Sequence, residues 1–145
     1  MASENYRKLI DEVCAIAKIA DPKLFYTTAD LTVDGVNFTL IDGSTEQEEG
    51  LAMYCDFGAL PAKNRADVLE RLLEINLSMH GVNTPVFTIN FETRHVLLAR
   101  RIPIGQISAL DLMNTLSEHA AHSKEWRKTY YLNEGRQSML ASGST

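Results

Sequence analysis

Two histidines one helical turn apart are the first residues of this chain whose spacing could support chemistry. His119 and His122 are three positions apart, so on a helix both imidazoles could contact one metal ion. A zinc site needs further ligands, and neither a cysteine nor a third histidine accompanies the pair at a metal-site spacing. Glu118 beside them does not complete a ligand set. The pattern favours two surface histidines, and we expect no metal.

The two cysteines, Cys14 and Cys55, do not indicate nucleophilic catalysis. A reactive thiolate needs an electropositive and partly exposed setting, whereas both cysteines stand within apolar patterns. We expect both to be small buried hydrophobic side chains. Two cysteines also provide no disulfide framework, which agrees with a reducing compartment.

The sequence lacks the usual groups for binding phosphate or for acid–base catalysis. The segment Gly58–Pro61 is too short for a phosphate loop and contains neither lysine nor serine. The chain has three candidate carboxylates for acid–base catalysis: Asp30, Asp34 and Asp42. All three stand in turn contexts and do not form a catalytic pair. Three arginines could bind an anion, although alternation along a strand explains them equally well: Arg94, Arg100 and Arg101. We therefore expect no cofactor and a protein that is not an enzyme.

Length and charge restrict the class of protein further. The chain has 145 residues and a net charge of −5, which indicates one globular domain with a sizeable core. An acidic balance argues against nucleic acid, because neutralising phosphates needs clustered Lys and Arg. No run of about 18 apolar residues could span or insert into a membrane, and the N-terminus lacks the pattern of a signal peptide. We expect a cytoplasmic protein.

Apolar periodicity predicts three helices and five strands. In order, they are helix 4–20 with Ser3 as N-cap, strands 31–33, 36–40 and 51–57, helix 64–79, strands 85–91 and 96–102, and a helix from 109 to about 130. Short turns between strands favour antiparallel pairing, so we expect an α+β domain with helices on one face of a twisted sheet. The domain should span residues 1–134, and the small polar residues 135–145 should form a disordered tail.

The first hairpin is the clearest local signal. Asp34-Gly35 accepts the positive φ angles of a two-residue turn, which pairs Val33 with Val36 and Leu31 with Phe38. The acidic segment 42–49 that follows is expected to be a solvated loop.

Two further local patterns concern the C-terminal half. Ser108 and Asp111 match a capping box in which Asp replaces the usual Glu or Gln, so a helix should begin there. The register of strand 96–102 stays open, since the turn before it does not decide whether Leu97 or Leu98 faces the core.

The helix predicted at 64–79 carries more apolar surface than one sheet can cover. Its apolar side chains and Asn76 spread over roughly 200° of the circumference, whereas a helix covering one sheet needs a stripe little wider than about 100°. They are Val68, Leu69, Leu72, Leu73, Ile75, Asn76, Leu77 and Met79, and the remaining face holds Asp67, Glu70, Arg71, Glu74 and Ser78. The simplest interpretation is that this helix packs on its own sheet and on another chain.

Asn76 stands in the middle of that apolar face. Buried without partners, its amide would cost about 1–3 kcal/mol in unmet hydrogen bonds. Across a two-fold axis it could pair with its own copy or with the partner's backbone. An internal bond to a neighbouring strand end would satisfy it equally well, and the sequence does not choose between these arrangements.

Several motifs in order resemble one known family. They are the hairpin around Asp34-Gly35, the run Tyr54–Pro61, the helix residues Arg65, Val68, Leu69, Leu72, Leu73, Glu74, Ile75 and Asn76, and then Pro85-Val86-Phe87. Together with the element order, they resemble the Tir chaperone (CesT-like) family, the small acidic class I chaperones of bacterial type III secretion. The resemblance covers about residues 4–130, nearly the whole predicted domain.

The resemblance implies a homodimer in the bacterial cytoplasm that binds the N-terminal segment of a secreted effector in extended form. Its second helix and the next strand build the dimer interface, which here points to Leu69, Leu72, Leu73, Asn76, Leu77, Phe87 and Ile89. Its first helix and first three strands bind the effector. The counterparts here are Leu9, Val13, Ile16, Leu31, Val33, Phe38, Leu40 and Met53, although several of these must be core.

Two other functions remain open on the sequence. A free-standing regulatory or sensory domain of the same α+β architecture would form no stable complex with an effector. An enzyme would need a cleft with converging polar groups.

Overall fold

The computed structural model describes residues 3–132, and the tail expected at 135–145 lies outside them. The predicted fold class and the order of three helices and five strands are confirmed, with two short 3-10 segments in addition. The elements are α1 (Glu4–Ile16), η1 (Pro22–Phe25), β1 (Ala29–Val33), β2 (Val36–Asp42), β3 (Gly50–Ala59), α2 (Arg65–Met79), β4 (Val86–Ile89), β5 (His95–Pro103), η2 (Ile104–Gln106) and α3 (Ala109–Thr129).

The five strands form one antiparallel sheet in the order β1-β2-β3-β5-β4. Asp34 and Gly35 have φ angles of 51° and 81°, as a two-residue hairpin turn requires. The hairpin pairs Val33 with Val36, and the predicted register is confirmed. β1 and β4 are the edge strands of the sheet.

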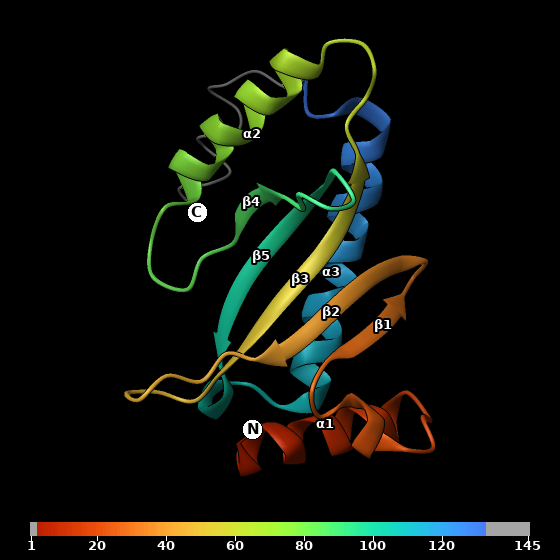
Figure 1. Cartoon of the computed structure of the whole chain (residues 1–145), viewed down its shortest axis with the longest axis vertical. Coiled ribbons are helices and arrows are strands. Elements are labelled where there is room, and N and C mark those ends of the chain that lie inside the picture. Colours follow the sequence, from red (N-terminus) through yellow and green to blue (C-terminus); the bar gives the residue numbers. More distant parts are fainter. Residues whose placement is uncertain (1–2, 133–145) are drawn as a thin grey trace.

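The helices lie on one side of the sheet and at its ends (Figure 1). α3 runs behind the sheet along β3, α1 lies at one end of the sheet, and α2 lies at the other end beside β4. Leu98 pairs with Cys55 on the face that α3 covers and is buried, whereas Leu97 lies on the opposite face. No helix among residues 3–132 covers that opposite face in Figure 1, so the sheet is one-sided.

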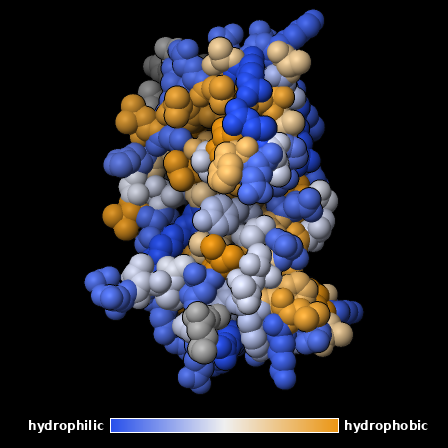
Figure 2. Space-filling model, viewed as in Figure 1, coloured by the Kyte–Doolittle hydropathy of each residue, from blue (hydrophilic) through white to orange (hydrophobic). Residues whose placement is uncertain are grey.

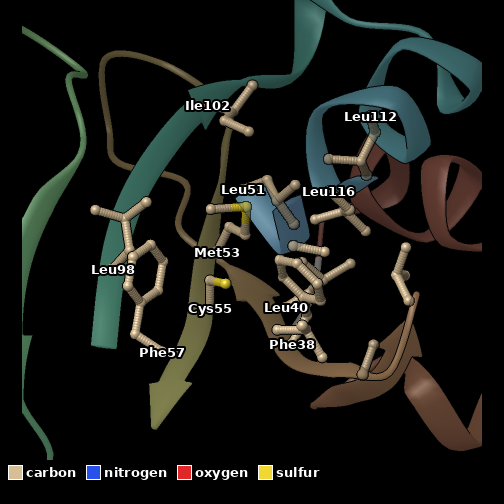
Figure 3. Packing of buried hydrophobic residues seen from close by; sticks show 14 of the residues in the cluster. Phe38, Leu40, Leu51, Met53, Cys55, Phe57, Leu98, Ile102, Leu112 and Leu116 are labelled. Carbon is tan, nitrogen blue, oxygen red and sulfur yellow. The ribbon is translucent and has the colours of Figure 1, made fainter. Parts of the chain in front are cut away.

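Alternate residues of β2 and β3 supply the core beneath α3 (Figure 3). The inward-facing side chains are fully or almost fully buried and meet Leu112, Leu116 and Trp126 of α3: Phe38, Leu40, Leu51, Met53, Cys55 and Phe57. The ring centroids of Phe57 and Trp126 lie 5.9 Å apart. Both cysteines are buried as predicted, and burial raises the pKa of the Cys55 thiol to about 12.

α1 ends at Ile16, so the predicted continuation to residue 20 is wrong. Lys18 adopts a left-handed φ of 58°. The amides of Lys18 and Ile19 donate back to the carbonyls of Ala15 and Cys14 at 3.3 and 2.8 Å, which is the Schellman arrangement. This ending turns Ile19 toward the core, whereas a continued helix would place it on the polar face.

β3 continues to Ala59, so the predicted turn at Gly58–Pro61 begins later than expected. The register with β5 shifts at a bulge between Asp56 and Gly58, where Gly58 has a φ of 114°. Arg127 of α3 stabilises the bulge, because its Nε donates to the Phe57 carbonyl at 2.7 Å and its Nη2 donates to the Asp56 carbonyl at 3.1 Å. Beyond the bulge, Gly58 pairs with Val96 and Ala59 pairs with His95, so the strand continues past its predicted end.

α3 begins with the predicted capping box. The Asp111 amide donates to Ser108 Oγ at 3.1 Å, and the Ser108 amide donates to the Asp111 carboxylate at 3.4 Å. On this helix His122 is exposed as predicted, but His119 is only 7% exposed, so its assignment to the surface is wrong. Burial lowers the pKa of His119 from 6.5 to about 4, and the charges of Arg100 and His122 act in the same direction.

We expect the buried His119 to make stability depend on pH. The folded chain holds this pKa at about 4, whereas the unfolded chain protonates near about 6.5. Stability should therefore fall as the pH drops through this window, by up to about 1.4 kcal/mol per pH unit. The substitution His119→Gln should reduce this loss in urea denaturation at about pH 7 and about pH 5, while His122→Gln removes only the smallest of the three causes and should leave most of the loss. Equal losses in wild type and His119→Gln would contradict the assignment.

Candidate interaction surfaces

α2 buries only part of its apolar circumference. Val68, Leu72 and Ile75 face the core and are 4% exposed or less. Leu73 and Leu77 point away from it and are 68% and 77% exposed. An exposed pair of leucines on one helix face is typical of an interaction site.

Asn76 has an internal partner. Its Oδ1 accepts a hydrogen bond from the Phe87 amide at 2.7 Å, and its Nδ2 donates to the Phe87 carbonyl at 3.1 Å. The amide thus pairs with the backbone of β4, which is the second of the two arrangements that the sequence left open. It joins α2 to the edge strand and fixes which face of the helix points outward.

Arg71 is placed differently from the prediction. The helical pattern assigns it to the solvent face, but it is 6% exposed. Its Nε donates to the Tyr131 carbonyl at 3.2 Å, and its Nη1 lies 3.6 Å from the Glu74 carboxylate. Tyr131, which follows α3, packs on this side of α2, and a pattern confined to α2 cannot reveal that contact.

The strand residues predicted for the dimer interface pack inward. Phe87 and Ile89 are partly buried against the core, and the ring centroids of Phe57 and Phe87 lie 5.1 Å apart. Alternation places Val86 on the opposite face of β4, where it is 44% exposed. Val82, in the loop before β4, is 89% exposed. Sequence reasoning missed both exposed valines, because alternation alone does not say which face of an edge strand is covered.

Most residues predicted to bind an effector lie in the core. Six of them are 9% exposed or less: Leu9, Val13, Val33, Phe38, Leu40 and Met53. Ile16 is 46% exposed at the end of α1, and Leu31 is partly buried on β1. Ile16 and Leu31 are therefore the most exposed members of this set.

Apolar surface gathers in two regions of the face shown in Figure 2. One lies over α2, and the other lies where η1 and β1 stand in Figure 1. Leu24 of η1 is 74% exposed, beside the Ile16 end of α1. Sequence reasoning missed Leu24, because the segment after Pro22 has no periodic pattern. We call Ile16, Leu24 and Leu31 the α1–β1 patch.

Asp56 and His95 form a histidine–carboxylate pair of the kind that acid–base catalysis uses. Nδ1 of His95 lies 3.1 Å from Oδ1 of Asp56. Within residues 3–132, no hydroxyl or thiol side chain hydrogen-bonds to this imidazole, and no three potential metal ligands come together. Of the arginines considered as anion ligands, Arg101 is already bonded to Glu48.

None of the described helices is long and apolar enough to cross a membrane.

On an α+β domain with a one-sided sheet, exposed apolar patches mark candidate sites of protein–protein contact. The profile of the Tir chaperone protein (CesT) family matches residues 27–127. The chain therefore belongs to the Tir chaperone family. A comparison with curated proteins gives no match.

Solved structures of low sequence identity share this fold. A chain of the ExsC-ExsE complex is 18% identical with a TM-score of 0.69, over 92% of this chain and 100% of that chain. A chain of the HopA1-SchA chaperone-effector complex is 15% identical with a TM-score of 0.62, over 86% and 94%. A chain of the ExoT-SpcS complex from Pseudomonas aeruginosa is 14% identical with a TM-score of 0.56, over 85% and 97%.

The two hydrogen bonds of Asn76 yield a stability prediction. Asn76→Ala leaves the amide and carbonyl of Phe87 without their side-chain partner, so we expect a loss of about 1–3 kcal/mol in the free energy of unfolding. Asn114→Ala, on the exposed face of α3, is the matched control and should change stability by less than about 0.5 kcal/mol. Chemical denaturation measures both variants. A loss for Asn76→Ala no larger than that of the control would show that the bonds do not hold α2 to β4.

Proposed function

We propose that this protein is a cytoplasmic chaperone that binds the N-terminal region of a type III secreted effector and keeps it secretion-competent. Membership of the Tir chaperone family is the observation that carries this proposal. The exposed apolar patches and a fold shared with a chain of the HopA1-SchA chaperone-effector complex support it. We refer to the bound protein as the client.

The client binds in extended form. β1 is an edge strand whose outer side has no strand partner among the described residues, and the α1–β1 patch lies beside it. An added strand gains main-chain hydrogen bonds at such an edge, while apolar pockets select alternate side chains. Ordering the segment costs conformational entropy, so the contact must be long to be stable. Binding energy alone holds the client non-globular, and the cycle needs no ATP.

The protein acts as a homodimer through α2. Leu73 and Leu77 form the centre of the interface, with Leu69 at its margin and Val86 and Val82 beside them. The remaining interface candidates face the core and hold α2 and β4 in position: Leu72, Asn76, Phe87 and Ile89. A two-fold contact lets the same patch cover itself and removes its leucines from water.

Charge in the exposed α2 surface should break the dimer. Leu73→Asp with Leu77→Asp places two carboxylates in the apolar contact while sparing the core, so we expect a folded monomer by light scattering and circular dichroism. Leu110→Asp is the control, because Leu110 is 61% exposed on α3, outside this surface. It should leave the dimer intact. A double variant that stays dimeric would refute the interface.

Co-purification tests client binding. The chain should retain the product of a neighbouring gene, or another secreted protein of its host, through about the first hundred residues of that protein and without added nucleotide. Ile16→Asp with Leu24→Asp in the α1–β1 patch should weaken retention by about tenfold or more, with the dimer unchanged. If no secreted protein of the host is retained, the regulatory or sensory domain becomes the better interpretation.

A further inference from the structure

A groove of about 600 Å³ opens at the α1 end of the molecule, between α1, the β2–β3 loop and η2. We call it the α1–η2 groove, and the residues that matter here are Lys8, Leu9, Glu12, Glu49, Ile104 and Ile107. It is separate from the exposed leucines of α2, which lie at the other end of the sheet (Figure 1). Its volume is within the range of about 300–1,000 Å³ that ligand sites occupy.

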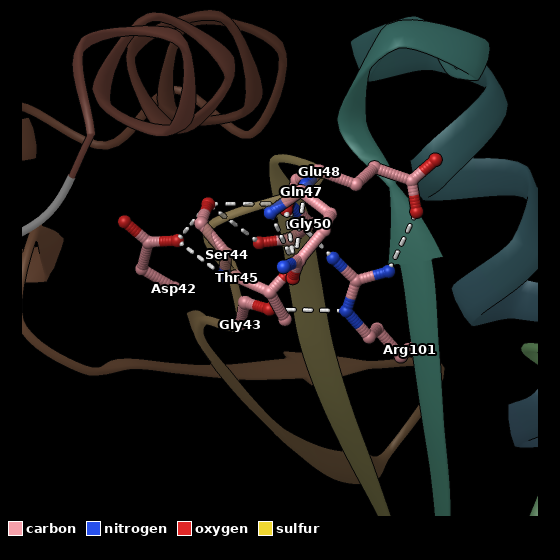
Figure 4. A network of polar contacts seen from close by, with 8 residues as sticks. All are labelled: Asp42, Gly43, Ser44, Thr45, Gln47, Glu48, Gly50 and Arg101. Atoms are coloured by element: carbon pink, nitrogen blue, oxygen red, sulfur yellow. Dashed lines mark hydrogen bonds and ion pairs between the residues drawn. The ribbon is translucent and has the colours of Figure 1, made fainter.

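Arg101 fixes the loop that forms one wall of this groove (Figure 4). Its Nε donates to the Gly43 carbonyl at 3.0 Å, its Nη2 donates to the Glu48 carbonyl at 2.9 Å, and its Nη1 pairs with the Glu48 carboxylate at 2.9 Å. A Cβ on Gly50 would lie 2.5 Å from the guanidinium carbon, so any larger residue there would displace the guanidinium from this position. The acidic loop is thus held in one conformation by β5.

The first turn of α1 is bonded to the same loop and strand end. The Ser3 amide donates to the Asp42 carboxylate at 2.6 Å, and Nδ2 of Asn5 donates to Oε2 of Glu49 at 2.7 Å. Both walls of the groove are therefore held by side-chain hydrogen bonds before any ligand arrives. Such preorganisation lowers the entropy cost of binding.

The groove combines an apolar floor with a negative rim. Leu9, Ile104 and Ile107 pack against the core and supply the floor. Its rim carries three carboxylates and one lysine: Glu12, Glu48, Glu49 and Lys8. Glu48 pairs with Arg101, whereas no Lys or Arg of the described chain forms an ion pair with Glu12 or Glu49.

We propose that the α1–η2 groove binds an extended stretch of the client in which an apolar side chain stands between Lys or Arg residues. This inference rests on the proposed function and names the chemistry of one segment that the chaperone selects. The apolar side chain lies on Leu9, Ile104 and Ile107. The flanking Lys or Arg side chains lay their methylenes along the groove and place their charges beside Glu12 and Glu49. The charge pattern thereby orients the segment and rejects acidic sequences.

Two labelled peptides test this chemistry directly. One repeats Lys, Leu and Ser, and its matched partner has Glu in place of each Lys. Fluorescence anisotropy at low salt should show the Lys peptide binding at least about tenfold more tightly than the Glu peptide. Carbon-13 methyl spectra should place its contacts at Leu9, Ile104 and Ile107. Equal affinities, or shifts confined to other methyl groups, would overturn the proposal.

Matched charge variants distinguish peptide binding at the groove from attraction by the overall negative charge of the protein. Glu12→Lys with Glu49→Lys should lower the affinity for the Lys peptide by about tenfold. Glu118→Lys with Glu125→Lys makes the same change of net charge on exposed positions of α3 and should lower it by less than about twofold. Equal losses in the two double variants would show that overall charge, not the groove, attracts the peptide.

The natural client distinguishes this inference from the function on which it rests. If wild type retains a secreted protein but the groove variant retains it equally well, the proposed function stands and the groove assignment fails. If wild type retains no secreted protein, the proposed function fails, whatever the peptides do.

Discussion

The packing of α3 across β2 and β3 determines where the other elements can pack on the sheet. Leu112, Leu116 and Trp126 fill the covered face of the sheet, so α2 is left with the end of the sheet and edge strand β4. That position buries one face of α2 and leaves Leu73 and Leu77 outside. The exposed leucines are thus a consequence of a core that is already complete, and they are available for a second chain.

The parts of the fold that depend on near neighbours could be predicted from the sequence. The Asp34-Gly35 turn, the capping box at Ser108 and the order of the elements each follow from short-range rules. The errors arise where a distant segment decides. β3 continues past its predicted end because it pairs with β5, and its bulge is bonded to Arg127, whose Nε donates to the Phe57 carbonyl seventy residues away in the chain. Only the packing of α3 on the sheet shows that His119 is buried.

Only some of the interaction surfaces could be predicted from the sequence, again because distant segments decide which faces are covered. Periodicity shows which residues share a face, but the covering layer decides whether that face is core or surface. α2 has so much more apolar surface than one sheet can cover that the sequence indicates an outward apolar face, which includes Leu73 and Leu77. On β4 alternation separates Phe87 and Ile89 from Val86 and Thr88, but it does not show which of these two faces the core covers. The α1–η2 groove has no sequence signal, because three segments far apart in the chain form it.

In the proposed complex, the α2 surfaces of two copies of this chain cover each other, and their α1–β1 patches stay free to hold one extended client segment. Native mass spectrometry of the chain co-expressed with its client measures this directly. The account predicts a complex of two copies of this chain and one client, which releases an intact dimer when the client is removed. A complex of one chain with one client, or a client that dissociates the dimer, would contradict it.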